Sequence, residues 1–232
     1  MITAIIGHVG RNAVFLAADT RRRSHAAGGG ISQVTKLHLW SDELLIAQGG
    51  AGSLATDRVL QALAAMQPKP LSAKDVIAGI NQLAPAIMTQ ARAAWAAKSM
   101  SMPPTHLVLA SVDVSAGLGL IQSIDLNTNI VLSVSNQLNQ PYMAGSNTPD
   151  VTNVVSQHYA LQTSSETVRW DVMVRDSVAD LEILHPQDIG LPVDVAKLSY
   201  DQNKKRFHAT KRTMTSKDPY WPRYRFKVGL GA

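Results

Sequence analysis

Residues 2–21, with the sequence ITAIIGHVGRNAVFLAADTR, contain two apolar runs separated by the turn-forming residues Gly-Arg-Asn. Two apolar runs on either side of a short turn rich in Gly and Asn predict a β-hairpin. A threonine precedes the first run, and the second run ends with an aspartate. The question is whether Thr3 is only a strand residue or lies at this position because its amine takes part in chemistry.

The composition describes a globular chain of 232 residues, of which 45% are apolar and 17% are charged. This length is enough for one domain with a sizeable core. The absence of cysteine excludes disulfides and thiolate metal sites. The histidines do not occur at metal-ligand spacing, and no apolar run reaches the 18 residues expected of a membrane span. We therefore expect no metal site and no membrane association.

Two glycine-rich stretches, residues 28–30 and 49–53, are not followed by the Gly-Lys-Ser/Thr sequence of a phosphate-binding loop. We therefore expect no nucleotide and no other cofactor.

The order of predicted elements indicates the fold class. After the hairpin we expect a loop over residues 21–32, strands over 35–40 and 43–48, and helices over 51–66 and 73–98. Three strands follow over 105–113, 117–125 and 129–135, then a turn over 142–151 that opens a helix to about 160, a helix over 163–184, and a last strand over 192–200. Ser72 and Ser165 are expected to cap helices, and Pro85 is expected to kink one.

Strands and helices thus occur in blocks and do not alternate, which favours antiparallel sheets with segregated helices, an α+β fold. Two helical pairs outside two sheets would make a four-layer αββα sandwich.

Positive charge is concentrated at the C-terminal end. The net charge is +5, and residues 197–232 hold ten Lys/Arg but only two Asp/Glu, so the rest of the chain is slightly acidic. We therefore divide the chain into a main domain, residues 1–200, and a basic aromatic extension, residues 201–232. The extension is suited to dock as an extended strand on a neighbouring subunit. Nucleic-acid binding through Lys, Arg and aromatic side chains is the less favoured alternative.

A threonine at a mature N-terminus can supply both nucleophile and base. Its hydroxyl attacks a carbonyl carbon while its own α-amine accepts the proton. The α-amine has an ordinary pKa of about 7.7–8.0, and a neighbouring lysine ammonium lowers that pKa by like-charge repulsion. Such a site requires a carboxylate that holds the lysine and backbone donors for the oxyanion.

The first fifty residues meet these requirements at spacings that resemble proteasome β-type subunits and their bacterial ring-protease relatives, which are N-terminal nucleophile hydrolases. The resemblance implies that Thr3 is the nucleophile. It assigns Asp19, in LAADTR, to the carboxylate that orients the lysine, and Lys36, in TKLHLW, to that lysine. Gly50, in IAQGGAG, falls on the glycine whose N–H stabilises the oxyanion.

Weaker matches extend the resemblance to about residue 200. AGSNTPDV resembles the Gly-Ser turn of the family, which implies that Ser146 lies near the amine. VRDSVAD resembles its Arg-Asp segment, which implies the same for Asp176. Gln48 falls on the floor of the substrate pocket, where it would favour a polar side chain, and Arg22 lies in a basic loop near the cleft. Both are assigned to substrate binding.

The resemblance also implies a polypeptide substrate, a homo-oligomeric ring fed by an AAA+ unfoldase, and a cytoplasmic location.

Other roles remain open for the single candidate residues. Thr3 and Lys36 could be ordinary strand residues, Asp19 a turn residue, and Asp176 the partner of Arg175 or Arg169 on a helix.

Two departures from the family pattern matter most. Ala179 stands where the family usually has a serine, so a hydrogen bond near the amine is missing or comes from Ser177. Met1 and the large Ile2 precede Thr3, whereas family precursors usually have glycine before the threonine. An inactive assembly protein that keeps Met1 and Ile2, and an amidase acting on a small molecule, are therefore the alternative functions.

Overall fold

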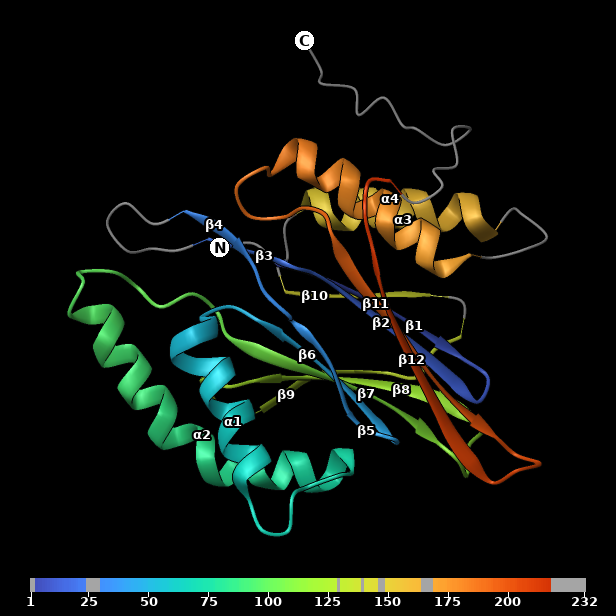
Figure 1. Cartoon of the computed structure of the whole chain (residues 1–232), viewed down its shortest axis with the longest axis horizontal. Coiled ribbons are helices and arrows are strands. Elements are labelled where there is room, and N and C mark those ends of the chain that lie inside the picture. The colour runs from blue at the N-terminus through green and yellow to red at the C-terminus, as the bar shows by residue number, and fades with distance from the viewer. Residues whose placement is uncertain are drawn as a thin grey trace.

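The structure is a computed structural model, and it describes residues 3–23, 30–128, 130–138, 140–145, 149–163 and 169–217. Two five-stranded sheets dominate it, and every strand pair within them is antiparallel. The prediction of antiparallel sheets with segregated helices is confirmed (Figure 1).

The first sheet has the strand order β10-β1-β2-β11-β12. Its strands are β10 (Pro141–Gly145), β1 (Ala4–Gly10), β2 (Ala13–Asp19), β11 (Val193–Asp201) and β12 (Arg206–Met214). The predicted hairpin at its centre is confirmed as β1 and β2.

The second sheet has the order β5-β6-β7-β8-β9. Its strands are β5 (Leu37–Ser41), β6 (Leu44–Gly49), β7 (His106–Asp113), β8 (Leu118–Asp125) and β9 (Ile130–Ser135). All five were expected from the sequence, because each combines a short apolar run with flanking turn residues.

The helices fall into two pairs. The first comprises α1 (Asp57–Ala65), preceded by a π-helical turn η1 (Gly52–Thr56), and α2 (Ala73–Ala96). The second comprises α3 (Pro149–Thr163) and α4 (Trp170–Leu184). Ser72 caps α2 as predicted, its Oγ accepting the Asp75 N–H at 3.2 Å, and the helix continues through Pro85. Ser165, the other predicted cap, lies outside the described residues.

Three groups of buried side chains hold these elements together. One joins α1 and α2 to the second sheet, and another joins α3 and α4 to the first sheet. The third lies between the two sheets and includes Ile5, Leu16, Val108 and Ile121. Figure 1 shows the helical pairs on the outer sides of the two sheets. Among the described residues, no helix has the length and apolar character needed to cross a membrane.

Three strands besides β12 were missed by the sequence analysis. β3 (Arg21–Arg23) and β4 (Ile31–Gln33) form a two-stranded ribbon at the ends of the segment expected to be a loop. Their residues are partly or fully exposed, so no apolar alternation marks them. β10 occupies the start of the segment expected to be a turn, and it pairs with β1.

β12 corrects the reading of the C-terminal end. Residues 206–214 were assigned to the extension, but they pair with the whole of β11 and form an edge of the first sheet. The strand is hard to recognise because one of its faces is exposed and carries charged and polar side chains. The sheet therefore continues to Met214, beyond the expected boundary at residue 200.

Candidate active site

The hairpin register brings Asp19 to the start of the chain. β1 and β2 are antiparallel and pair Ile5 with Ala18, so the end of β2 lies beside the beginning of β1. The Ala4 N–H donates to Asp19 Oδ1 at 3.0 Å. Thr3, the residue before Ala4, is 2% exposed. Asp19 thus fixes the backbone directly after the proposed nucleophile.

Asp19 also binds Lys36, which comes from the segment leading into the second sheet. The Lys36 Nζ lies 2.9 Å from Asp19 Oδ2, and both side chains are buried. The Arg21 N–H donates to the same carboxylate oxygen at 3.1 Å. Burial raises the pKa of Asp19, and this effect is opposed by the Lys36 ammonium and by the two backbone donors. All three partners are donors, which is the environment that favours a carboxylate.

Gly50 occupies a position that only glycine fits. Its φ of +93° lies in the left-handed region that L side chains rarely adopt. A Cβ added there would lie 2.1 Å from the Pro104 carbonyl oxygen. The next residue, Ala51, donates its N–H to Thr105 Oγ1 at 3.1 Å, which holds the turn in place. Outside the helices and the sheet ladders, no hydrogen bond found among the described residues uses the Gly50 N–H.

These groups meet at one small cavity, which we call the threonine cavity. Its lining contains two of the proposed catalytic side chains, the proposed oxyanion glycine and both residues assigned to substrate binding. The lining residues are Thr3, Arg22, Lys36, Gln48, Gly49, Gly50, Gly52 and Thr56. The structure therefore brings together Thr3, Lys36 and Gly50 from three separate segments, with Asp19 bonded to Lys36.

The amide of buried Gln48 is fixed by its neighbours. Its Nε2 donates to the Thr35 carbonyl oxygen at 3.0 Å and lies 3.3 Å from His38 Nε2. Burial lowers the pKa of His38, and the nearby Lys211 adds to this effect, so a neutral ring can accept the second amide proton. Gln48 Oε1 has no hydrogen-bond partner among the described residues. The threonine cavity therefore has an unused acceptor in its lining.

Arg22 forms another part of the lining and is held by a partner on α1. Its guanidinium makes two hydrogen bonds to Asp57, at 2.9 and 3.2 Å. Gly52 allows the close approach, because a Cβ there would lie 2.3 Å from Arg22 Nη2. The positive charge of Arg22 in the cavity lining is therefore already neutralised by the Asp57 carboxylate.

Asp176 is located on α4 and has a different environment. Its carboxylate accepts a hydrogen bond from Arg175 Nε at 2.7 Å, so the pairing with Arg175 in the alternative reading is confirmed. Both side chains are buried, however, so the pair does not lie on a helix surface as that reading expected. Burial raises the pKa of Asp176, and Arg175 opposes this increase. No interaction between Asp176 and Thr3 is found among the described residues.

Two further expectations concern the surroundings of the amine. The Ser177 hydroxyl donates to the Met173 carbonyl oxygen, one turn earlier in α4, at 2.9 Å. No hydrogen bond between Ser177 and Thr3 is found among the described residues, so the suggestion that Ser177 replaces the missing family serine stays a prediction. Ser146 lies outside the described residues.

Sequence reasoning missed several residues next to the threonine cavity. His106 packs against Gly49, where an added Cβ would lie 2.6 Å from its ring, and burial lowers the pKa of His106 to about 4. Asp57 and His38 support the side chains of Arg22 and Gln48. None of these residues stands at a distinctive spacing, since each is specified only by contacts across the fold. Within the described ranges, no group of three or more His, Asp and Glu is arranged to hold a metal ion.

The comparisons with known proteins bear on the fold alone. No family model and no curated protein matches the chain. Among solved structures, the chain is similar to an Anbu (Gly-1) mutant from Hyphomicrobium sp. strain MC1, with a TM-score of 0.56 and 14% sequence identity. The match covers 93% of this chain and 88% of that chain. The two proteins share a fold over nearly their whole length.

Proposed function

We propose that this chain is a threonine-type peptidase subunit of a self-compartmentalised ring protease, with the four-layer αββα sandwich of N-terminal nucleophile hydrolases. The observation that carries the proposal is that Lys36 lines the same cavity as Thr3 while Asp19 binds Lys36 and the backbone after Thr3. The likeness of fold to Anbu adds support at the level of architecture.

In the proposed reaction the Thr3 hydroxyl attacks the scissile carbonyl carbon, and the α-amine of Thr3 accepts the hydroxyl proton. The Lys36 ammonium, held by Asp19, lowers the pKa of that amine so that it is neutral at physiological pH. The Gly50 N–H donates to the tetrahedral oxyanion. The amine then passes the proton to the leaving amine of the substrate, and a new ester links the acyl group to Thr3.

In deacylation, water is the nucleophile and the Thr3 hydroxyl is the leaving group. Water attacks the ester carbon, the Thr3 amine accepts a proton from the water, and the hydroxyl leaves with that proton. Ser146 and Asp176 complete the proposal as residues that position the amine, Asp176 acting from its place on α4.

The substrate is a polypeptide, and Gln48 contributes to the choice of side chain bound next to the scissile bond. Its unpaired Oε1 favours a side chain that carries a hydrogen-bond donor. Arg22 shapes the same wall but is engaged by Asp57, so an acidic substrate side chain would have to compete with an internal carboxylate.

The proposal extends to a homo-oligomeric ring, an AAA+ unfoldase that feeds it, and a cytoplasmic location. A low content of charged residues, 17%, is in keeping with surfaces covered by neighbouring subunits. The division into a peptidase domain and a basic extension remains part of the proposal, with the sheet now reaching Met214.

The reaction requires cleavage of the peptide bond between Ile2 and Thr3. Intact-mass measurement of the purified protein tests this step, and turnover of a fluorogenic peptide library tests the activity. We expect a mass lacking residues 1 and 2, and hydrolysis that is abolished in Thr3→Ala and retained in part in Thr3→Ser.

The alternatives predict different results. A retained Met1 with no hydrolysis supports an inactive assembly protein with the same fold. Exposure of Thr3 together with turnover of small amides but no peptides supports an amidase. Peptide hydrolysis that persists in Thr3→Ala would overturn the assignment of the nucleophile.

A further inference from the structure

A second and larger cavity lies on the outer face of the first sheet, beneath the N-terminal end of α4. It has a volume of about 310 Å³, at the lower end of the range typical of small-molecule sites. Its lining residues come from β2, β11, β12 and the start of α4 and are Phe15, Arg169, Trp170, Asp171, Val195, Ala196, Lys197, Thr210, Lys211 and Arg212. We call it the basic cavity.

The strand register builds the floor of the basic cavity. Lys197 on β11 pairs with Phe15 on β2 and with Thr210 on β12, so these three residues form one row across the sheet. Arg212 lies in the next row on the same face, opposite Val195. Lys211 points to the other face, where its ammonium binds the Leu37 carbonyl oxygen and Asp194.

Aromatic rings form one wall of the basic cavity. Trp170 stacks on His8 with ring centroids 3.8 Å apart, and its ring lies 6.4 Å from that of Phe15. Burial lowers the pKa of His8 to about 4, so this ring is neutral at physiological pH. The wall is therefore flat, apolar and uncharged.

The other groups around the cavity carry an excess of positive charge. Arg169, Lys197 and Arg212 contribute three cations, and Asp171 is the single carboxylate among the described lining residues. Asp171 is shared, lying 3.1 Å from Arg212 and 3.7 Å from Arg169. Lys197 is exposed and lies 5.4 Å above the Phe15 ring, and it makes no ion pair among the described residues.

The start of α4 adds to this potential. Arg169 is the residue at the N-terminal cap position, and it makes no side-chain capping hydrogen bond. The partial positive charge of the helix N-terminus lies in the same region as the three cations, and Asp171 in the first turn offsets part of it by accepting the Val172 N–H at 2.9 Å. A basic rim around an apolar floor is complementary to a molecule that combines an anionic group with a flat apolar body.

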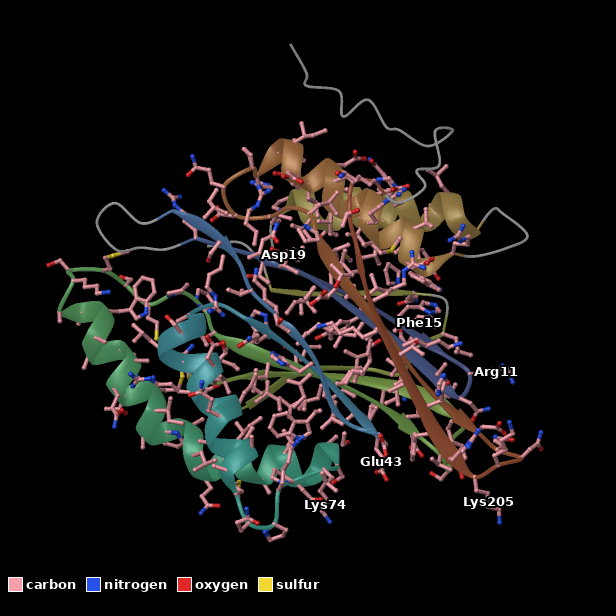
Figure 2. All side chains as sticks on the ribbon, viewed as in Figure 1. Arg11, Phe15, Asp19, Glu43, Lys74 and Lys205 are labelled. Atoms are coloured by element: carbon pink, nitrogen blue, oxygen red, sulfur yellow. The ribbon has the colours of Figure 1, made fainter. Side chains whose placement is uncertain are left out.

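We propose that the basic cavity binds a small organic anion that carries one phosphate, sulfonate or carboxylate group on a flat apolar body. The anionic group binds Lys197 and Arg212, and the flat body packs against Phe15 and Trp170. This site is distinct from the threonine cavity. Phe15 and Asp19 are four residues apart on β2, which corresponds to about 13 Å along an extended strand, and Figure 2 shows them at separate places on the sheet.

Calorimetric titration of the full-length protein with phenyl phosphate tests the proposal. We expect saturable binding that weakens as the salt concentration rises, because the anionic group is held by charged side chains. Lys197→Met, which keeps the length of the side chain and removes its charge, is expected to weaken binding roughly tenfold. Lys204→Met removes one charge from the turn of the same β11–β12 hairpin and is expected to leave binding unchanged.

A second variant fills the cavity without changing its charge. Thr210 is an exposed residue of an edge strand, so Thr210→Phe is expected to fold, as thermal unfolding would verify, and to abolish binding. Thr3→Ala is expected to bind phenyl phosphate like the unmodified protein, since the two cavities are separate.

Three outcomes would overturn the proposal: no saturable binding of phenyl phosphate, equal losses in Lys197→Met and Lys204→Met, or binding of the neutral benzyl alcohol as tight as that of phenyl phosphate. Binding that survives in folded Thr210→Phe would place the anion elsewhere on the protein and would equally contradict it.

Discussion

The two cavities differ in how their charges are balanced. In the threonine cavity each cation has its own carboxylate, since Lys36 binds Asp19 and Arg22 binds Asp57. In the basic cavity Arg169 and Arg212 share Asp171, and Lys197 makes no ion pair among the described residues. A charge that is neutralised within the protein can shift the pKa of a neighbouring group without attracting a free ion. A surplus of one sign instead favours an external ligand of the other sign.

The packing behind the two cavities is more alike. A buried histidine supports each of them: His106 contacts Gly49 in the threonine cavity, and His8 stacks on Trp170 in the basic cavity. Burial lowers the pKa of both rings to about 4. The difference between the cavities therefore comes from the side chains that line them, which can be changed one at a time.

The largest effect is expected from Lys36→Met. Without the Lys36 ammonium the Asp19 carboxylate is unopposed and raises the pKa of the Thr3 amine above its ordinary range, so the amine stays protonated at neutral pH. Peptide hydrolysis is expected to fall about 1,000-fold, within the range for loss of a general base. Phenyl phosphate binding in the basic cavity is expected to remain unchanged. Lys197→Met is the matched control and should show the reverse pattern, with full hydrolysis and weakened binding. Hydrolysis within tenfold of normal in folded Lys36→Met would contradict the assigned role.

A second large effect is expected from Gly50→Ala. The added Cβ would collide with the Pro104 carbonyl oxygen at 2.1 Å, and the φ of +93° would be strained. The turn must therefore shift and move the N–H that we propose faces the oxyanion, so kcat is expected to fall roughly 100-fold. Gly30→Ala is the control, because a Cβ at Gly30 meets no atom within 4 Å. Equal kcat values for the two variants would remove Gly50 from the mechanism.

The sequence predicted the central part of the fold for a simple physical reason. The hairpin of β1 and β2 and the strands of the second sheet are apolar runs with turn residues between them. They can therefore be recognised from the sequence without knowledge of the fold. Asp19, Lys36 and Gly50 stand at the ends of such strands, and they were chosen as candidate site residues through the resemblance of the first fifty residues to proteasome β-type subunits. Their meeting at one cavity required the three-dimensional arrangement, because they belong to different sheets and turns.

The features that were missed depend on contacts between distant segments. β12 carries charged residues on its exposed face and is stable as a strand because β11 pairs with it along nine residues. The basic cavity likewise cannot be recognised from the sequence. Phe15, Lys197 and Thr210 lie side by side only because of the register in which β2, β11 and β12 pair. Local propensity contains no information about such pairings.

A smaller effect is expected from Asp176→Asn. Because Asp176 is paired with Arg175 and is not bonded to Thr3, it can position the amine only through intervening groups. We expect kcat to fall about tenfold with KM unchanged, less than the loss of a general base. The free energy of unfolding is also expected to fall, because a buried guanidinium loses its carboxylate.

Arg175→Met separates these two effects. It also breaks the buried pair, so its free energy of unfolding should fall as in Asp176→Asn, whereas its kcat should stay closer to that of the unmodified protein. Identical kcat values in the two variants, measured at equal folded fractions, would restrict Asp176 to a structural role and remove it from the proposed mechanism.

The smallest effect concerns acid stability and follows from His106 and His8, the buried histidines behind the two cavities. His106 is neutral in the folded protein down to a pKa of about 4, whereas in the unfolded chain it binds a proton below its ordinary pKa of 6.5. Between these values the unfolded state holds more protons, so the free energy of unfolding falls as the pH decreases from 6.5 towards 4. For His106 the loss is about 1–2 kcal/mol at about pH 5.

Denaturant unfolding of the unmodified protein and of His106→Asn, at neutral pH and near pH 5, measures this contribution as a shallower pH dependence in the variant. His8→Phe, which keeps a ring against Trp170, should show the same trend for the basic cavity. His208→Asn, a change on the exposed face of β12, should leave the pH dependence as it was. If His106→Asn and His208→Asn have the same pH dependence, the ring behind Gly49 is not held neutral by burial, and the similarity drawn between the packing of the two cavities fails.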